Sequence, residues 1–238
     1  MQTMQHTEQS LQPFNIIYHN DDFVVVNKPA NINFHDEDNP GKGLFNQVKN
    51  QFSELYPVHR LDKMTSGLIL FAKNKETAAK FGQMFEQHEI QKYYIAISRF
   101  KPKKKQGWIK GDMEKSRRSS FKLLRTMNNP AVTQFFSYSI ETGLRLFLLR
   151  PLTGKTHQLR VALNSIGSAI AGDDIYNTAQ QKLDDRGYLH AYALYFNLNN
   201  QAFEFIQTPD SGELFLQENC QNIIATIKKP GTLPWPKV

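Results

Sequence analysis

The chain of 238 residues contains a single cysteine, Cys220. One thiol cannot form an intramolecular disulfide or a cysteine-rich zinc site, and such cysteine usage is typical of a reducing compartment. The longest apolar runs, 23–26 and 67–72, are far shorter than the ~18 residues that a membrane-spanning helix needs. The first residues also lack the basic and apolar regions of a secretory signal peptide. These absences predict a cytoplasmic protein without a membrane partner.

Several catalytic motifs are missing as well. The seven histidines form no H-E-x-x-H pattern and no i, i+4 pair on an expected helix, so we expect no metal site. The sequence has no G-x-S-x-G, which argues against a serine hydrolase. Residues 152–156 (LTGKT) resemble part of a phosphate-binding P-loop, but that motif needs a glycine at position 149, where this chain has leucine. A nucleotide hydrolase is therefore only a weak alternative.

What the sequence has in excess is positive charge, and this charge is concentrated in one segment. The chain has 29 Lys and Arg residues against 22 Asp and Glu residues, a net charge of +7. Residues 99–125 contain eleven basic and two acidic residues, whereas the rest contains 18 basic and 20 acidic ones. Such a segment is typical of a protein that binds a polyanion. On charge alone, a solvated lysine-rich loop explains it equally well.

The hydrophobic pattern predicts an α+β fold with a mixed, largely antiparallel central sheet and flanking helices. Asn74 is the expected N-cap of one helix, and Gly167 is expected to end another. We expect residues 13–238 to form a single domain, preceded by a flexible polar tail over residues 1–12. The expected strands are 14–18, 23–28, 67–73, 92–98, 132–140, 144–149, 188–198 and 203–207, and the expected helices are 75–88, 156–166 and one near 212–219.

A polar cluster, HRLDKMTSGL, occupies residues 59–68. Asp62 lies there between Arg60 and Lys63 and precedes an expected buried strand. A carboxylate at that position would be held rigidly, as a catalytic group must be. The pattern alone favours the alternative of a salt-bridged aspartate on the surface.

This cluster resembles the signature of the RluA-type pseudouridine synthases, which isomerise uridine to pseudouridine within RNA. Further segments are similar to other motifs of that family and occur in its order. They are 26–29 (VNKP), 92–96 (KYYIA), 153–161 (TGKTHQLRV), Gly172-Asp173 with Tyr176, and 189–191 (LHA). Together they extend over about residues 14–207. Lys155 departs from the family, which usually has arginine there, and loses the planar guanidinium.

The resemblance implies the roles of the site residues in a substrate cleft. Asp62 is the catalytic carboxylate, which attacks C1′, adds to uracil C6, or deprotonates the sugar to give a glycal; these three routes stay open. Arg160 is its ion-pair partner. Tyr94 stacks on the uracil or assists removal of the C5 proton, although the pattern alone favours a core tyrosine. Arg60 enters the space that a flipped nucleotide leaves, and His59 and Lys155 bind substrate.

The resemblance also implies the partners. Isomerisation neither oxidises nor hydrolyses, so no cofactor is expected. The expected partner is structured RNA, ribosomal or transfer. The N-terminal part is too short for the small RNA-binding domain of some members, so we expect a catalytic domain alone. The sequence leaves the oligomeric state open, with a monomer as the default. An RNA-binding relative without catalytic activity is an alternative, against which the presence of Asp62, Tyr94 and Arg160 argues. From charge alone, we expect these residues of the basic segment to contact phosphates: Lys103, Lys104, Lys105, Arg117 and Arg118.

Overall fold

A computed structural model describes residues 14–36, 40–117, 119–177 and 184–236. The tail that the sequence predicts over residues 1–12 lies outside the described residues. The strands are β1 (Asn15–His19), β2 (Phe23–Lys28), β3 (Tyr56–Pro57), β4 (Ser66–Ala72), β5 (Gln91–Ser98), β6 (Gln106–Gly111), β7 (Met113–Lys115), β8 (Phe121–Leu123), β9 (Ala131–Glu141), β10 (Leu144–Pro151), β11 (Leu189–Leu198) and β12 (Gln201–Ile206). The helices are α1 (Leu44–Lys49), α2 (Lys75–Glu86), α3 (Gln158–Ser165), α4 (Glu213–Leu216) and α5 (Glu218–Thr226), followed by a 3₁₀ turn over Pro230–Thr232.

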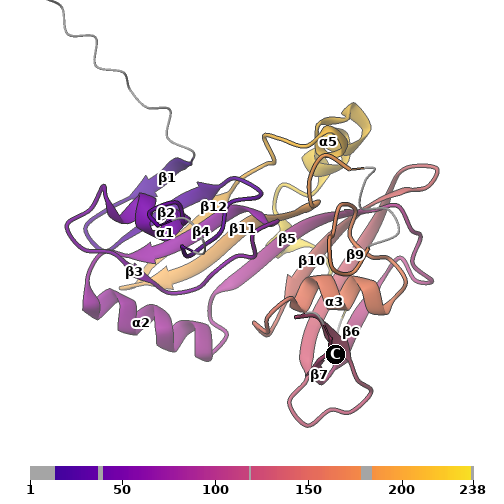
Figure 1. Cartoon of the computed structure of the whole chain (residues 1–238), viewed down its shortest axis with the longest axis horizontal. Coiled ribbons are helices and arrows are strands. Elements are labelled where there is room, and N and C mark those ends of the chain that lie inside the picture. The colour runs from indigo at the N-terminus through magenta and orange to yellow at the C-terminus, as the bar shows by residue number, and fades with distance from the viewer. Residues whose placement is uncertain (1–13, 37–39, 118, 178–183, 237–238) are drawn as a thin grey trace, which may run out of the picture.

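One sheet of ten strands runs through the whole molecule (Figure 1). Its main path has the order β1-β2-β4-β11-β5-β10-β9-β6, with β12 paired to β11 and β3 paired to β4. Strands β4 and β11 are parallel, and the other pairs of this sheet are antiparallel. This confirms the predicted α+β fold with a mixed, largely antiparallel sheet.

The two faces of the sheet are buried by different elements. Phe23 and Val25 of β2 pack with Phe81 and Met84 of α2, whereas Val24 and Val26 belong to a separate apolar cluster on the other face. That alternation follows from the period of two in a strand. The second cluster contains Leu44 and Val48 of α1, and a third one spans β5, β9, β10, α3 and α5.

Side-chain hydrogen bonds define the turn after β1 and the predicted start of α2. The Asn20 carboxamide oxygen accepts the N–H groups of Asp22 and Phe23 at 2.9 and 2.8 Å, which closes the turn between β1 and β2. The Asn74 side chain accepts the Thr77 N–H at 2.8 Å, and this N-cap satisfies one of the unpaired donors of α2. Among the described residues, no helix is long and apolar enough to cross a membrane.

The structure corrects two predictions of secondary structure and adds strands that were not predicted. Helix α3 begins at Gln158 rather than Thr156, because His157 has a left-handed backbone with φ of 56°. The expected helix near 212–219 is two helices, α4 and α5, because Gln217 between them is extended. The segment with the excess of basic residues also forms strands β6, β7 and β8, which the sequence analysis did not predict.

Candidate active site

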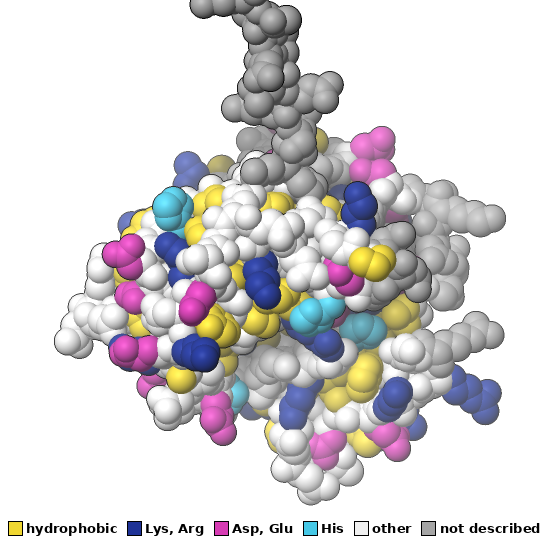
Figure 2. Space-filling view, turned by 60° about the vertical axis from the view of Figure 1, so that its left-hand side comes forward, with side chains coloured by type: hydrophobic (Ala, Val, Ile, Leu, Met, Phe, Trp, Pro, Cys, Tyr) yellow, Lys and Arg dark blue, Asp and Glu magenta, His cyan; other side chains and the backbone are white. Residues whose placement is uncertain are grey.

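Three segments meet at a cavity of about 470 Å³. They are the loop before β4, the first half of β5, and the segment that connects β10 to the start of α3. The cavity wall contains Asp62, Tyr94 and Arg160, so the structure brings together the three residues that the sequence predicts to be catalytic. Figure 2 shows a face on which histidine and basic side chains gather around a central hollow.

Asp62 lies on the tight loop that leads into β4. Its carbonyl oxygen accepts the Thr65 N–H at 3.0 Å, and its side chain is 25% exposed. Gly67 at the start of β4 has φ of +103°, and a Cβ atom there would lie 2.3 Å from the Ala191 carbonyl oxygen. Only glycine therefore permits the close approach of β4 to β11. This contact fixes the base of the loop that carries Asp62.

Arg160 faces Asp62 but is held by other carboxylates. Its Nη1 lies 3.6 Å from Asp62 Oδ2, whereas Nε and Nη2 each donate to the Asp173 carboxylate at 2.7 Å. Nη2 also donates to Asp174 at 3.0 Å. Burial alone would lower the pKa of Arg160, but the hydrogen bonds and charge of Asp173 outweigh burial and raise the pKa. The guanidinium is therefore a fixed positive charge beside Asp62.

Tyr94 and its neighbour Tyr93 face opposite sides of β5, as strand alternation predicts. Tyr94 lines the cavity, whereas Tyr93 is buried against the rings of Tyr195 and Trp235. Burial, together with the negative charge of Asp62, raises the pKa of the Tyr94 hydroxyl. That hydroxyl is therefore protonated at neutral pH.

His59 also lines the cavity, but one of its ring nitrogens is used within the protein. Nε2 accepts the N–H of Leu70 in β4 at 3.0 Å. Burial, together with the charge of Lys92, lowers the pKa of His59 to about 3. The ring is therefore neutral, and it ties the loop to the strand that follows it.

Lys92 is a cavity residue that the sequence analysis did not include among the site residues. Its ammonium lies 5.2 Å from the centre of the Phe85 ring, and burial lowers its pKa. Within the described part of the chain it has no carboxylate partner within 4.0 Å. The signal was present in the sequence, because residues 92 and 94 lie on the same face of a strand.

The other predicted binding residues lie around the cavity. Arg60 is exposed, and its Nη2 lies 3.5 Å from the Thr156 hydroxyl. The Lys155 ammonium donates to the Asn129 carboxamide at 2.8 Å, and the Lys155 N–H donates to the Gln158 side chain at 2.9 Å. Both Arg60 and Lys155 line the cavity.

The basic segment is divided between two places. Lys103, Lys104 and Lys105 precede β6, and the Ser137 N–H donates to the Lys105 carbonyl at 2.6 Å. Val132 pairs with Lys110 at the opposite end of β6. Its N–H donates to the hydroxyl of Thr153 in the cavity wall at 2.9 Å, so the cavity borders that end of β6. The structure therefore does not bring these three lysines to Asp62.

The β7–β8 hairpin, which carries Arg117, is linked to the site. The Phe121 N–H donates to the Tyr176 hydroxyl at 2.8 Å, and that hydroxyl lies 3.1 Å from His157 Nδ1. Arg117 is exposed at the hairpin turn, and Arg118 lies outside the described residues. Two cations of the basic segment are paired internally: Arg99 with Asp184 at 2.6 Å and Lys122 with Glu114 at 2.8 Å.

Comparison with known proteins supplies a family for this arrangement. The family described as RNA pseudouridylate synthase matches residues 22–165. An uncharacterized RNA pseudouridine synthase of Haemophilus influenzae is 46% identical over 85% of this chain and 90% of its own length. The ribosomal large subunit pseudouridine synthase C of Rickettsia bellii is 33% identical over 74% of this chain, which spans only 61% of that relative.

A solved structure has the same fold. Human RNA pseudouridylate synthase domain containing 1 superposes with a TM-score of 0.72 and 24% identity, over 96% of this chain and 98% of that one. At this level of identity, the likeness concerns the fold alone.

Proposed function

Because the chain belongs to the RluA-type RNA pseudouridine synthase family and is an isomerase of RNA uridine, we propose that it acts on ribosomal RNA with Asp62 as its catalytic carboxylate. The observation that supports this most is the 3.6 Å pair of Asp62 and Arg160 in a cavity that also contains Tyr94. The name of the Rickettsia bellii relative, which refers to the large ribosomal subunit, favours ribosomal over transfer RNA. We propose one catalytic domain over residues 13–238.

The reaction leaves the atomic composition of the nucleotide unchanged. The N1–C1′ bond breaks, the uracil turns, and a C5–C1′ bond forms. The proton on C5 leaves and N1 ends with a proton. The protein therefore needs a group that starts bond cleavage, a surface that holds the detached uracil, and a path for one proton.

Asp62 is suited to starting the cleavage. Its ionised oxygen is the nucleophile or base, and Arg160 places a positive charge beside it that Asp173 keeps from moving. Because that charge is in place before substrate arrives, no reorganisation is needed during the reaction.

Tyr94 has two tasks in this proposal. Its ring faces the cavity and stacks on the uracil, which a flat aromatic surface holds irrespective of orientation. Its hydroxyl contacts the base during removal of the C5 proton. Because burial raises the pKa of this hydroxyl, it acts in its protonated form, as a hydrogen-bonding and proton-relaying group.

The target uridine must leave the RNA helix to reach these groups, at a cost of roughly a few kcal/mol. Arg60 is exposed at the cavity edge, where its guanidinium can occupy the space that the nucleotide leaves. Lys92 adds an uncompensated positive charge to the cavity wall, and this charge favours the approach of a phosphodiester.

Tritium release from RNA that carries 5-tritiated uridine tests the proposal. Ribosomal and transfer RNA are compared as substrates, and we expect release from ribosomal RNA. Asp62→Asn, which keeps the shape of the side chain but not its charge, is expected to abolish release while RNA affinity stays within about threefold. Asp21→Asn, at an exposed turn, is the matched control and should behave as wild type. Full activity of Asp62→Asn would refute the assignment.

A further inference from the structure

A second cavity lies on the other side of the Asp62 loop, and the reaction proposed above does not use it. Its volume is about 440 Å³, close to the 470 Å³ of the cavity proposed above to bind the uridine. The Asp62–Arg160 pair lines both, so these side chains belong to the wall between two spaces of similar size. The residues common to the two cavities are Arg60, Leu61, Asp62, Thr156, His157 and Arg160.

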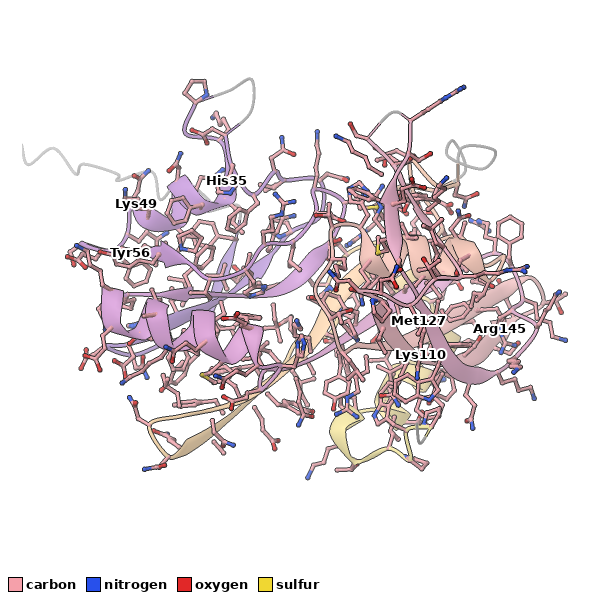
Figure 3. All side chains as sticks on the ribbon, turned by 90° about the horizontal axis from the view of Figure 1, so that it is seen from below. His35, Lys49, Tyr56, Lys110, Met127 and Arg145 are labelled. Atoms are coloured by element: carbon pink, nitrogen blue, oxygen red, sulfur yellow. The ribbon has the colours of Figure 1, made fainter. Side chains whose placement is uncertain are left out.

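The far wall of the second cavity is formed by residues between 31 and 35, which follow β2. Asn31, Asn33 and His35 line it. His35 is exposed, and Figure 3 shows it on the half of the molecule opposite to Lys110 and Met127. Between Asn33 and His35, Phe34 is buried and its ring stacks on Phe71 with centroids 5.9 Å apart. The buried ring anchors the polar side chains on either side of it.

A second anchor follows directly. The Asp36 carboxylate accepts the N–H groups of Gly41 and Gly43 at 2.5 and 2.7 Å and the Asn46 side-chain amide at 2.8 Å. The Leu44 N–H also donates to the Asn33 carbonyl at 2.9 Å. The wall with its amide and imidazole groups is therefore built in place against α1.

The chemistry of this lining selects the class of ligand. The charges of the lining are of both signs and partly paired, because Arg160 donates to Asp174 at 3.0 Å and lies 3.6 Å from Asp62. Such a lining favours neither a free phosphate nor a metal cation. A neutral ring with hydrogen-bonding edges requires no net charge of either sign. Amides and imidazoles pair with the edges of a nucleobase, and an imidazole ring also stacks on its face. The volume lies in the range of small-ligand pockets.

The shared wall determines where that base comes from. A base bound in the second cavity would lie next to the uridine, as the bases of consecutive nucleotides of one RNA strand do. Resting on the proposed function, we propose that the cavity lined by Asn31 and His35 binds the base of the nucleotide adjacent to the target uridine. The enzyme then reads two neighbouring bases, one on each side of the Asp62 loop, with Arg60 between them.

The test compares an RNA substrate with versions that have an abasic site directly 5′ or 3′ of the target uridine. We expect one of the two abasic sites to raise the Kd for wild type and to lower kcat/KM by about tenfold or more, as loss of one stacked base does. In the double variant Asn31→Gly, His35→Ala, the ratio of the Kd for the abasic RNA to the Kd for the intact RNA should fall to within about twofold of one. Glycine at position 31 suits its positive φ of 64°.

His19→Ala, which removes a histidine outside both cavities, is the control and should keep the full ratio. Equal Kd values of wild type for the intact RNA and both abasic RNAs would overturn the inference, and so would an undiminished ratio in the double variant. Absence of tritium release from every intact RNA would instead count against the proposed function, because the Kd ratio is measured independently of turnover.

Discussion

The geometry of the candidate active site depends on one buried aspartate that does not face the cavity. Asp173 is fully buried and holds Arg160 by two equal hydrogen bonds of 2.7 Å. Asp173 is therefore a positioning residue: it fixes the orientation of the Arg160 guanidinium that faces Asp62. A bidentate pair of this kind also explains why lysine at position 160 would not be conservative.

At the same scale, the two tasks of Tyr94 can be separated by substitution. Tyr94→Phe keeps the ring and removes the hydroxyl, so we expect kcat to fall roughly 10²-fold with RNA affinity within about threefold. Tyr94→Leu removes both and should also weaken binding by about tenfold, because a stacked base is lost. Single-turnover tritium release and Kd measurements distinguish the two effects. Wild-type kcat in Tyr94→Phe would restrict this residue to stacking.

At the scale of elements, the two parts of the basic segment make different predictions. The lysines 103–105 lie at the end of β6 remote from Asp62, whereas Lys115 and Arg117 are exposed on the hairpin that contacts His157 through Phe121. A short RNA stem-loop bound at the cavity should contact the hairpin, and only a longer RNA should reach the three lysines.

We therefore expect two variants to differ. Lys115→Ala with Arg117→Ala should weaken binding of a short stem-loop and reduce its salt dependence, by a slope of close to one per lost phosphate contact. The triple variant Lys103→Ala, Lys104→Ala, Lys105→Ala should weaken binding and reduce the salt dependence only with long RNA. Affinities measured between 50 and 200 mM salt provide the slopes. If neither variant changes the slope for any RNA, the basic segment does not contact phosphates.

How much the sequence could predict varies with the element. Strands β2 and β4 were predictable because they are apolar runs that the sheet buries completely. The hairpin was not, since MEK and FKL are only three residues each and are too short for an apolar pattern to identify a strand. Backbone hydrogen bonds of Asp112 with Leu124 and Thr126 continue the pairing beside them. Helix α1 was missed for a similar reason: its N-cap Gly43 makes no side-chain cap, and burial of Leu44 and Val48 stabilises it instead.

The candidate site shows the same division. The proximity of Asp62, Tyr94 and Arg160 was implied by motifs, whereas the sequence did not show that Asp173 directs Arg160. The second cavity could not be predicted, because it exists only once the segment around His35 folds against α1.

At the scale of the whole molecule, buried neutral histidines make stability depend on pH. His190 lies between the Ser66 hydroxyl at 2.7 Å and the Gln207 carbonyl at 2.8 Å, and burial lowers its pKa to about 4. The unfolded chain, with a histidine pKa of ~6.5, binds this proton more readily. The stabilisation is therefore complete above about pH 6.5 and is lost as the pH falls to about 4.

We expect the free energy of unfolding to fall by roughly 3 kcal/mol on this account between those pH values. Urea unfolding at pH 7, 6, 5 and 4.5 measures it. His190→Gln should remove this share of the pH dependence and leave the share of His59, whose pKa burial also lowers, to about 3. His19→Gln, at an exposed position, should leave the whole dependence unchanged. A wild-type unfolding free energy that does not change over this range would contradict the prediction.

The position of β11 in the strand order has a consequence for how the molecule acquires its structure. Strands β1, β2 and β4 come from residues 15–72, and strands β5, β6, β9 and β10 come from residues 91–151, so each group pairs through contacts within its own part of the chain. Only β11, residues 189–198, joins them (Figure 1). Asp62 lies within the first part of the chain, just before β4, and Tyr94 lies in β5 of the second group. During synthesis from the N-terminus, all strands of both half-sheets therefore emerge before the strand that joins them, and we expect the catalytic centre to form only after β11 has left the ribosome.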